Sequence, residues 1–244
     1  MHRNDPTSQE LQRRRYENYQ RAHAAQARLL DRMVTKRHAL IRDHIPLPSE
    51  GKVLEIGCGE GVFLGRIFSP ECKLFGLDLA TANLHSAREI LPPDASLAQG
   101  DACSLPFADN SFKFVFVNGV FHHVPDRRAM ATEAMRVVAP GGGIAVIEPN
   151  RGNPLYMAVA LIKAHERGLL SFSGKDLHSL FGANLVDSRL IPFSNYDFPY
   201  YGFPPVRLQS FVDFVEKGPL GRVAHTHWLF VGRKASSSRS AANP

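Results

Sequence analysis

The 244-residue chain is predicted to form a doubly wound α/β fold, in which helices cover both faces of a mostly parallel sheet. Three observations predict it: short apolar runs alternate with helix-like segments between residues 50 and 150, a glycine-rich turn follows the first run, and an acid ends the second. Apolar runs separated by helices are typical of parallel strands that are buried on both faces. Ligands of such sheets bind beyond the carboxyl ends of the strands, so we expect the chemistry there.

The expected elements follow one another along the chain, and each is assigned from its hydrophobic period and its end signals. The expected strands are KVLEIG (52–57), CKLFGLDL (72–79), SLAQGDA (96–102), FKFVFVNG (112–119), GGIAVIEPN (142–150), LVDSRLIPF (185–193) and HWLFVGRK (227–234). The expected helices are GVFLGRIF (61–68), TANLHSAREIL (81–91), RRAMATEAMRVV (127–138) and an apolar helix within RGNPLYMAVALIKAHERGLLSF (151–172).

Composition favours a globular domain with a full core. Hydrophobic residues make up 44% of the chain and charged residues 21%. The apolar runs are shorter than the ~20 residues that span a bilayer, and the N-terminus has no apolar signal region, so we expect a cytoplasmic protein. Cys58, Cys72 and Cys103 form no CxxC motif and no Cys/His ligand set, which predicts neither a disulfide nor a metal site.

The net charge of +6 lies at the two ends of the chain. Residues 1–45 hold ten Lys and Arg against five Asp and Glu, and their apolar spacing predicts an amphipathic helix. Residues 46–232 hold 16 basic and 18 acidic side chains, and the tail 235–244 is predicted to be disordered. The distribution favours a solvated helical segment over a nucleic-acid-binding arm.

The turn VLEIGCGEG (53–61) is the most informative motif. Gly57, Gly59 and Gly61 allow the backbone to approach a ligand closely. Asp78 ends the next strand, where a carboxylate can accept hydrogen bonds from ribose hydroxyls. The turn therefore predicts a cofactor that contains adenosine.

The spacing within the turn distinguishes between adenosine cofactors. It is GxGxG, whereas the dinucleotide fingerprint is GxGxxG, and the acids Glu55 and Glu60 would repel a pyrophosphate. Acids suit the sulfonium and ammonium groups of S-adenosylmethionine, which is the cofactor we expect. A nicotinamide-dependent oxidoreductase is the alternative.

Residues 50–150 resemble the class I S-adenosylmethionine-dependent methyltransferases, especially the small-molecule group called methyltransferase type 11, which is similar to the ubiquinone and menaquinone C-methyltransferases. The resemblance implies a Rossmann-like sheet of seven strands with the last strand antiparallel, and S-adenosylhomocysteine as the product of the cofactor. The motifs that carry it are VLEIGCGEG, GLDL, QGDACSLPFADNSFKFVFVNGVFHHVPD and VVAPGGGIAVIEPN.

The resemblance also implies roles for residues of the first motif. Glu55, Gly57 and Gly59 would hold the methionine end of the cofactor, and Gly61 would permit the turn.

Residues of the later motifs would hold the rest of the cofactor. Asp78 would bind the ribose, and Leu79 would pack on the adenine. Asp101 would receive the adenine amino group beside the Ala102 backbone, and Asn118 would face the methionine portion through its backbone or its amide.

Methyl transfer requires placement of a nucleophile and removal of its proton, for which a histidine is suited. His122 and His123 follow the fourth strand, where the methyl group should lie. Adjacent residues of a helical turn point about 100° apart, so one of the two is expected to face the pocket and the other to pack or cap. We favour His122 as the base, and a packing role for both is the alternative.

His227 is expected to have a structural role at a strand edge.

The acceptor is expected to be bound outside the shared core. The domain is predicted over residues 46–234, with a helical lid over 1–45 and insertions at about 151–180 and 195–225. The second insertion is rich in aromatic residues and proline, which can wall an apolar cavity. We expect a small organic acceptor, an apolar, aromatic or glycolipid-like metabolite, that is methylated at a hydroxyl group.

Several alternatives stay open. Methylation of a carbon or nitrogen atom, a noncatalytic cofactor-binding partner subunit and contact with a membrane surface all fit the sequence. An RNA methyltransferase is disfavoured because enzymes that methylate base amines carry an Asn/Asp-Pro-Pro-aromatic run where this chain has Asn118-Gly119-Val120-Phe121. The sequence does not indicate the oligomeric state.

Overall fold

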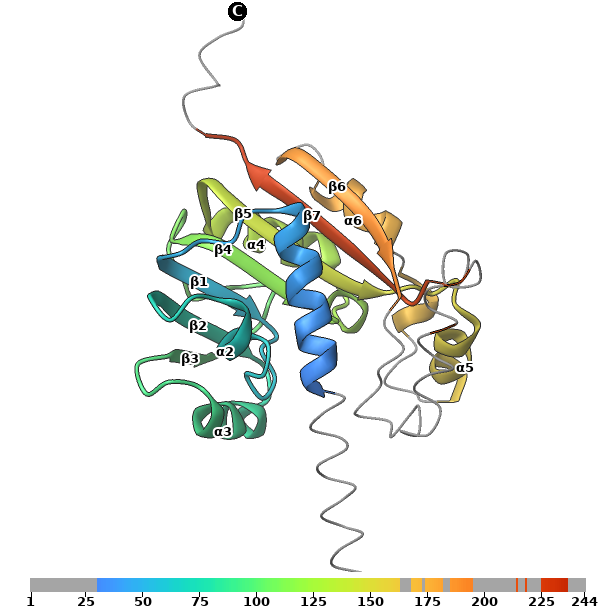
Figure 1. Cartoon of the computed structure of the whole chain (residues 1–244), viewed down its shortest axis with the longest axis horizontal. Helices are drawn as coiled ribbons and strands as arrows, with labels where there is room; N and C mark the ends of the chain where they lie inside the picture. The colour runs from blue at the N-terminus through green and yellow to red at the C-terminus, as the bar shows by residue number, and fades with distance from the viewer. Residues whose placement is uncertain are drawn as a thin grey trace, which may run out of the picture.

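A computed structural model of the chain describes residues 30–162, 168–172, 174–181, 185–194, 214, 218 and 225–236. Its strands form one seven-stranded sheet in the order β3-β2-β1-β4-β5-β7-β6 (Figure 1). The strands are β1 (Gly51–Ile56), β2 (Cys72–Asp78), β3 (Ser96–Gln99), β4 (Phe112–Asn118), β5 (Val138–Pro149), β6 (Leu185–Phe193) and β7 (His227–Lys234).

The sheet is mostly parallel, as predicted. β3, β2, β1, β4 and β5 pair in parallel, whereas β7 runs antiparallel to both β5 and β6. β1 lies between β2 and β4, so the strand order reverses at β1. The carboxyl ends of these three strands therefore meet at the topological switch point, where α/β folds bind ligands.

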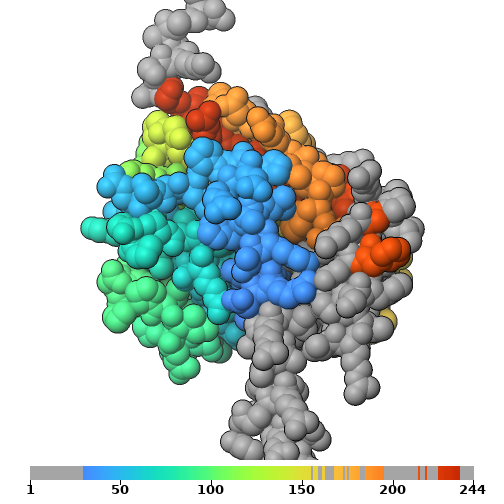
Figure 2. All heavy atoms as spheres, in the orientation of Figure 1, coloured from blue at the N-terminus to red at the C-terminus, as the bar shows by residue number. Residues whose placement is uncertain are grey.

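Helices cover both faces of the sheet. The N-terminal helix (residues 30–44), α2 and α3 lie on one face, and α4 and α6 lie on the other (Figure 1). In Figure 2 the blue atoms of the N-terminal helix lie between the first half of the domain and the orange atoms of β6. The labelled helices are α2 (Leu64–Ile67), α3 (Thr81–Ile90), α4 (Arg127–Val137), α5 (Pro154–Ile162) and α6 (Gly174–Phe181), with a 3₁₀ turn, η1 (Phe121–His123).

Helix α2 is shorter than the sequence predicts. The prediction began the helix at Gly61, but Gly61 has φ 77°, a left-handed conformation that a right-handed helix excludes. Its N–H instead donates to the Cys58 carbonyl and closes the glycine-rich turn. The other predicted strands and helices lie where expected, with shifts of a few residues at their ends.

Side chains of each strand alternate between two buried cores. On β1 and β4, Val53, Phe114 and Phe116 face the N-terminal helix, while Leu54 and Val115 face α4. The same alternation places polar residues at the edge of the sheet where the parallel strands end and β7 begins. Those on the face of the N-terminal helix are Glu55, Asn118 and His227, whereas Glu148 is on the opposite face.

Several expectations lie outside the described residues. These are the structure of residues 1–29, most of the insertion at 195–225, and the tail after residue 236. Within the part of the chain that is described, none of the helices has the length and hydrophobicity needed to cross a bilayer.

Candidate cofactor and active site

A pocket of about 310 Å³ opens at the carboxyl ends of β1, β2, β3 and β4. The pocket is lined by residues at the ends of these four strands and in the turns that follow them. These residues are up to 67 positions apart in sequence, from Gly57 to Val124. The lining residues are Gly57, Leu77, Asp78, Leu79, Gly100, Asp101, Ala102, Asn118, Gly119, Val120, His123 and Val124.

The glycine-rich turn is shaped by positive φ angles. Gly57, Gly59 and Gly61 have φ angles of 70°, 52° and 77°, which side chains rarely tolerate. A Cβ atom on Gly57 would lie 2.3 Å from Cγ2 of Val120, so the close packing of these two residues requires glycine. Gly57 lines the pocket, whereas Gly59 and Gly61 shape the turn behind it.

Asp78 connects the turn to the end of β2. Its Oδ2 accepts the Gly59 N–H at 2.8 Å, and its Oδ1 accepts the Ala80 N–H at 2.9 Å and the Asn83 amide at 3.1 Å. A carboxylate has about four acceptor positions, so three are occupied within the protein. The fourth, on Oδ2, is available to a hydroxyl group in the pocket.

The end of the pocket beyond β2 and β3 suits a flat heterocycle. Leu79 is 73% exposed and lines the pocket beside Ala102. Asp101 is exposed, and its Oδ1 accepts the Cys103 N–H at 2.8 Å, which orients the carboxylate. An apolar side chain and an oriented acceptor together can hold an adenine ring and its amino group.

At the other end of the pocket, Asn118 belongs to a buried polar network. Its Oδ1 accepts a hydrogen bond from Nη1 of Arg37 at 2.5 Å. Nη2 of Arg37 lies 2.9 Å from Nε2 of His227, which is also 2.9 Å from the Tyr156 hydroxyl. Nδ1 of His227 contacts Oγ1 of Thr226 at 2.8 Å. The network joins the N-terminal helix, β4, α5 and β7.

Glu55 lies behind the turn and is only 1% exposed. Burial raises the pKa of its carboxyl well above the usual value; the Leu64 N–H, which donates to it, opposes this rise, and the charge of Asp78 adds to it. Its Oε2 has no hydrogen-bond partner among the described residues. Burial, together with Glu55 and Asp78, also raises the pKa of Cys58 to about 12, so this thiol stays protonated.

The two adjacent histidines differ in exposure, although the centres of their rings lie only 3.9 Å apart. His123 is exposed and lines the pocket. His122 is buried, and its Nδ1 lies 2.7 Å from Oε2 of Glu148. Oε1 of Glu148 accepts the N–H groups of Val120 and Phe121, both at 2.8 Å. The fully buried Glu148 therefore fixes η1 as well as the His122 ring.

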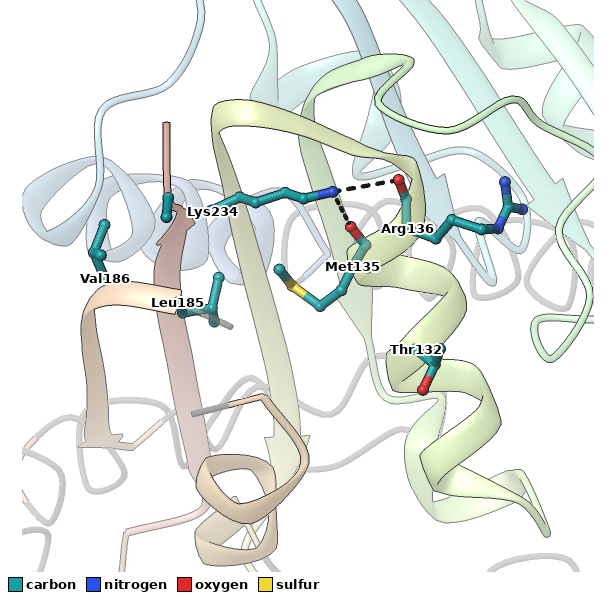
Figure 3. Close-up of a pocket in the computed structure, with 7 residues that line it drawn as sticks. Thr132, Met135, Arg136, Leu185, Val186 and Lys234 are labelled. Carbon is teal, nitrogen blue, oxygen red and sulfur yellow. Dashed lines mark hydrogen bonds between the residues drawn. The ribbon is translucent and has the colours of Figure 1, made fainter. Parts of the chain in front are cut away.

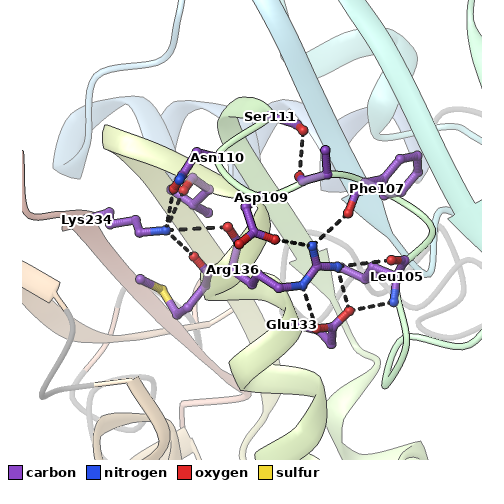
Figure 4. Close-up of polar contacts among 11 residues, drawn as sticks. Leu105, Phe107, Asp109, Asn110, Ser111, Glu133, Arg136 and Lys234 are labelled. Atoms are coloured by element: carbon purple, nitrogen blue, oxygen red, sulfur yellow. Dashed lines mark hydrogen bonds and ion pairs between the residues drawn. The ribbon is translucent and has the colours of Figure 1, made fainter.

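A larger pocket, of about 520 Å³, lies at the opposite end of the sheet, between α4, β6 and the end of β7 (Figure 3). Its Lys234 donates to the carbonyls of Met135 and Val138 at 2.7 and 2.8 Å and to Oδ1 of Asn110 at 2.8 Å. Its Arg136 is bonded to nearby acids and carbonyls (Figure 4). Both cations hold the end of α4 in place, so we assign this pocket a structural role.

The residues of the smaller pocket fit an S-adenosyl cofactor. Gly57 lines the cavity without a side chain, and oriented acids lie at the end of β2 and after β3. The buried Oε2 of Glu55, which has no hydrogen-bond partner among the described residues, suits a ligand that carries positive charge. A dinucleotide pyrophosphate would bring negative charge to this acidic turn instead.

Comparisons with known proteins agree with this geometry. Residues 54–146 match the family model described as a methyltransferase domain. The chain is 27% identical to a demethylmenaquinone methyltransferase of Staphylococcus haemolyticus over 204 residues, 77% of this chain and 82% of the relative. It is 36% identical to a 2-methyl-6-phytyl-1,4-hydroquinone methyltransferase of Synechocystis over 109 residues, 43% of this chain and 34% of the relative.

The fold is shared with solved structures. A methyltransferase of Thermotoga maritima has a TM-score of 0.62 and 20% identity, and the match covers 91% of this chain and 97% of that chain. The Rossmann-like fold is that of solved methyltransferase structures. Residues 54–146 are a methyltransferase domain, so the chain is an S-adenosylmethionine-dependent methyltransferase with S-adenosylmethionine as its cofactor.

Three polar residues near the pocket were not predicted from the sequence to belong to the site. They are Arg37, Glu148 and His227, the last of which contacts Arg37. A signal existed for Arg37, because it is four residues from both Met33 and Ile41, which are buried. Glu148 stands in an otherwise buried apolar strand, which marks a polar group that must have a partner.

Proposed function

We propose that the protein transfers the methyl group of S-adenosylmethionine to a hydroxyl group of a small organic acceptor. The observation that carries this proposal is the single pocket that unites Gly57, Asp78, Asp101 and Asn118. When bound, the cofactor supplies a methyl group that its sulfonium makes strongly electrophilic. The protein then has to position the acceptor, exclude water and remove a proton.

The cofactor contacts follow from the pocket. Asp78 would accept a ribose hydroxyl through the remaining position of its Oδ2, and Leu79 would cover the adenine. Asp101 and the Ala102 backbone would bind the adenine edge, and Asn118 would contact the amino-acid portion.

Two further residues complete the assignment of the turn. The Gly57 backbone would lie against the cofactor. Glu55 would act from behind the turn, where a cationic ligand would favour the ionised form of its buried carboxyl.

We infer that His123 is the base, because it is the member of the histidine pair that lines the pocket. His122 would have a supporting role, since its Nδ1 is engaged by Glu148 and its ring lies 3.9 Å from that of His123. A base must be within reach of the proton that it removes, so position has priority over pKa in this choice.

A hydroquinone-type or phenolic acceptor is the first choice for the substrate class. Two relatives are named for demethylmenaquinone and for a phytyl hydroquinone. The same likeness favours a second candidate, methylation at a ring carbon of such an acceptor.

The test is a methyl-transfer assay with labelled S-adenosylmethionine and a panel of apolar phenols, hydroquinones and short RNAs. We expect a phenol or hydroquinone to be labelled, and NMR of the product would distinguish an O-methyl from a C-methyl group. Labelling of RNA alone would contradict the proposal. Cofactor binding without turnover on a broad panel would favour a noncatalytic partner subunit.

His123→Ala and His122→Ala provide the matched pair for the base. His123→Ala should keep cofactor affinity and lose roughly 10²-fold or more in turnover. His122→Ala should keep most of its turnover and lose thermal stability, because Oε2 of Glu148 loses its contact with His122. The reverse pattern would make His122 the base.

A further inference from the structure

We propose that Arg37 of the N-terminal helix is a positioning residue for the cofactor and acts through the side chain of Asn118. The inference rests on the proposed cofactor site and deepens it. Arg37 lies outside residues 54–146, which match the methyltransferase family model.

Arg37 occupies an unusual place for a charged side chain. It is on the buried stripe of its helix, one turn from Met33 and one turn from Ile41, and is only 7% exposed. Its guanidinium lies 5.5 Å from the centre of the Phe63 ring. A buried guanidinium is costly unless it makes good hydrogen bonds, so its bonds to the sheet are expected to be well defined.

The contact with Asn118 fixes the orientation of the amide group. A guanidinium can only donate hydrogen bonds, so the atom of Asn118 that faces Nη1 must be the carbonyl Oδ1. The amide nitrogen then faces away from Arg37. Asn118 lines the cofactor pocket, so the proposed contact with the cofactor is made by the N–H₂ group of its amide.

A second contact holds Arg37 from the side of β7. Nη2 is also an obligate donor, so Nε2 of His227 must be the acceptor and its Nδ1–H donates to Oγ1 of Thr226. His227 is therefore neutral, in agreement with burial and the charge of Arg37, which lower its pKa well below the usual value. The guanidinium is thus held between two strand ends.

An N–H donor at this end of the pocket suits an anion. The acids Asp78 and Asp101 mark the adenosine end, so the part of the cofactor nearest Asn118 is its amino-acid portion. That portion carries a carboxylate, which is the acceptor that an amide N–H prefers. Arg37 would therefore set the affinity for the amino-acid end and leave the adenosine end unaffected.

The experiment compares two ligands by calorimetry: S-adenosylhomocysteine, and 5′-methylthioadenosine, which lacks the amino-acid portion. For Arg37→Met and for Asn118→Ala we expect affinity for S-adenosylhomocysteine to fall roughly 10-fold or more, the size of one lost hydrogen bond to a charged group. Affinity for 5′-methylthioadenosine should stay within about twofold. Retained binding of this second ligand also shows that the variants are folded.

A double-variant cycle tests whether Arg37 acts through Asn118. The double variant Arg37→Met/Asn118→Ala should bind S-adenosylhomocysteine no more weakly than Asn118→Ala alone, because one interaction is lost only once. Additive losses would overturn the inference, as would unchanged affinity in Arg37→Met. Arg42→Met, an exposed position on the same helix, is the control and should behave like the unmodified protein.

Asn118→Asp covers the case in which Arg37→Met does not fold. This variant keeps an acceptor for Arg37 but replaces the N–H donor with a second acceptor, so it should fold and lose affinity for S-adenosylhomocysteine alone. Equal weakening of both ligands would contradict the inference. If the unmodified protein binds 5′-methylthioadenosine and S-adenosylhomocysteine but the variants do not behave as expected, only the role of Arg37 fails and the proposed cofactor site stands. If the unmodified protein binds neither ligand, both the cofactor site and the role of Arg37 fail.

Discussion

Replacing Asp78 by Asn should weaken both the turn and the cofactor site, because one carboxylate serves both. In the protein, Asp78 accepts three N–H groups, two at Oδ1 and one at Oδ2. An asparagine offers a single oxygen, and its amide N–H₂ would face an N–H group on whichever side it is placed. The substitution is nearly isosteric, so the effect isolates hydrogen bonding from packing.

The magnitude follows from these contacts. An N–H donor left without an acceptor costs about 1–3 kcal/mol, which lowers the melting temperature of a domain of this size by roughly 2–10 °C. The lost charge-assisted bond to the ribose should weaken binding of S-adenosylhomocysteine by roughly 10- to 100-fold.

Calorimetry and thermal unfolding measure the two effects separately. Asp94→Asn, which changes an exposed acid in the loop before β3, is the matched control and should leave both quantities unchanged. If Asp78→Asn binds S-adenosylhomocysteine within twofold of the unmodified protein, Asp78 does not bind the ribose and that assignment fails.

Two further predictions concern stability. Glu55→Gln should raise the melting temperature at pH 7–8, because burial raises the pKa of Glu55 and its buried carboxyl becomes increasingly destabilising as pH rises above the unfolded value of 4.5. The gain should shrink toward pH 4.5 in a series of unfolding curves, and a gain that grows toward acid would show the opposite linkage. Lys234→Met should lower the melting temperature by roughly 3–10 °C, since the carbonyls of Met135 and Val138 lose their cation at the end of α4. Its affinity for S-adenosylhomocysteine should be unchanged, and a loss of affinity would connect the larger pocket to the cofactor site.

The local parts of the site could be predicted from sequence because local chemistry determines them. A glycine-rich turn after β1 needs positive φ angles, and acids at strand ends of a parallel sheet meet at one edge. Asp78 and Asn118 end β2 and β4 as expected. The approximate 100° between neighbours in a helical turn predicted that His122 and His123 would point apart, but their rings lie in contact, and only His123 lines the pocket.

The long-range contacts could not be predicted in the same way. Arg37 and Asn118 are 81 residues apart, and His122 and Glu148 are 26 apart, so each pair depends on how helices and strands pack. Sequence periodicity placed Arg37 within a helix but did not show that it faces the sheet. Glu148 could be recognised as a polar residue in a buried strand, but its partner depends on the position of η1 beside β5.

The most direct test of the central claim is a calorimetric titration of the unmodified protein with S-adenosylhomocysteine, with NADH as the control ligand. We expect S-adenosylhomocysteine to bind at about micromolar affinity, or roughly −8 kcal/mol, and NADH to give no heat of binding. Preference for NADH, or binding of neither ligand, would contradict the assignment of the switch-point pocket to S-adenosylmethionine.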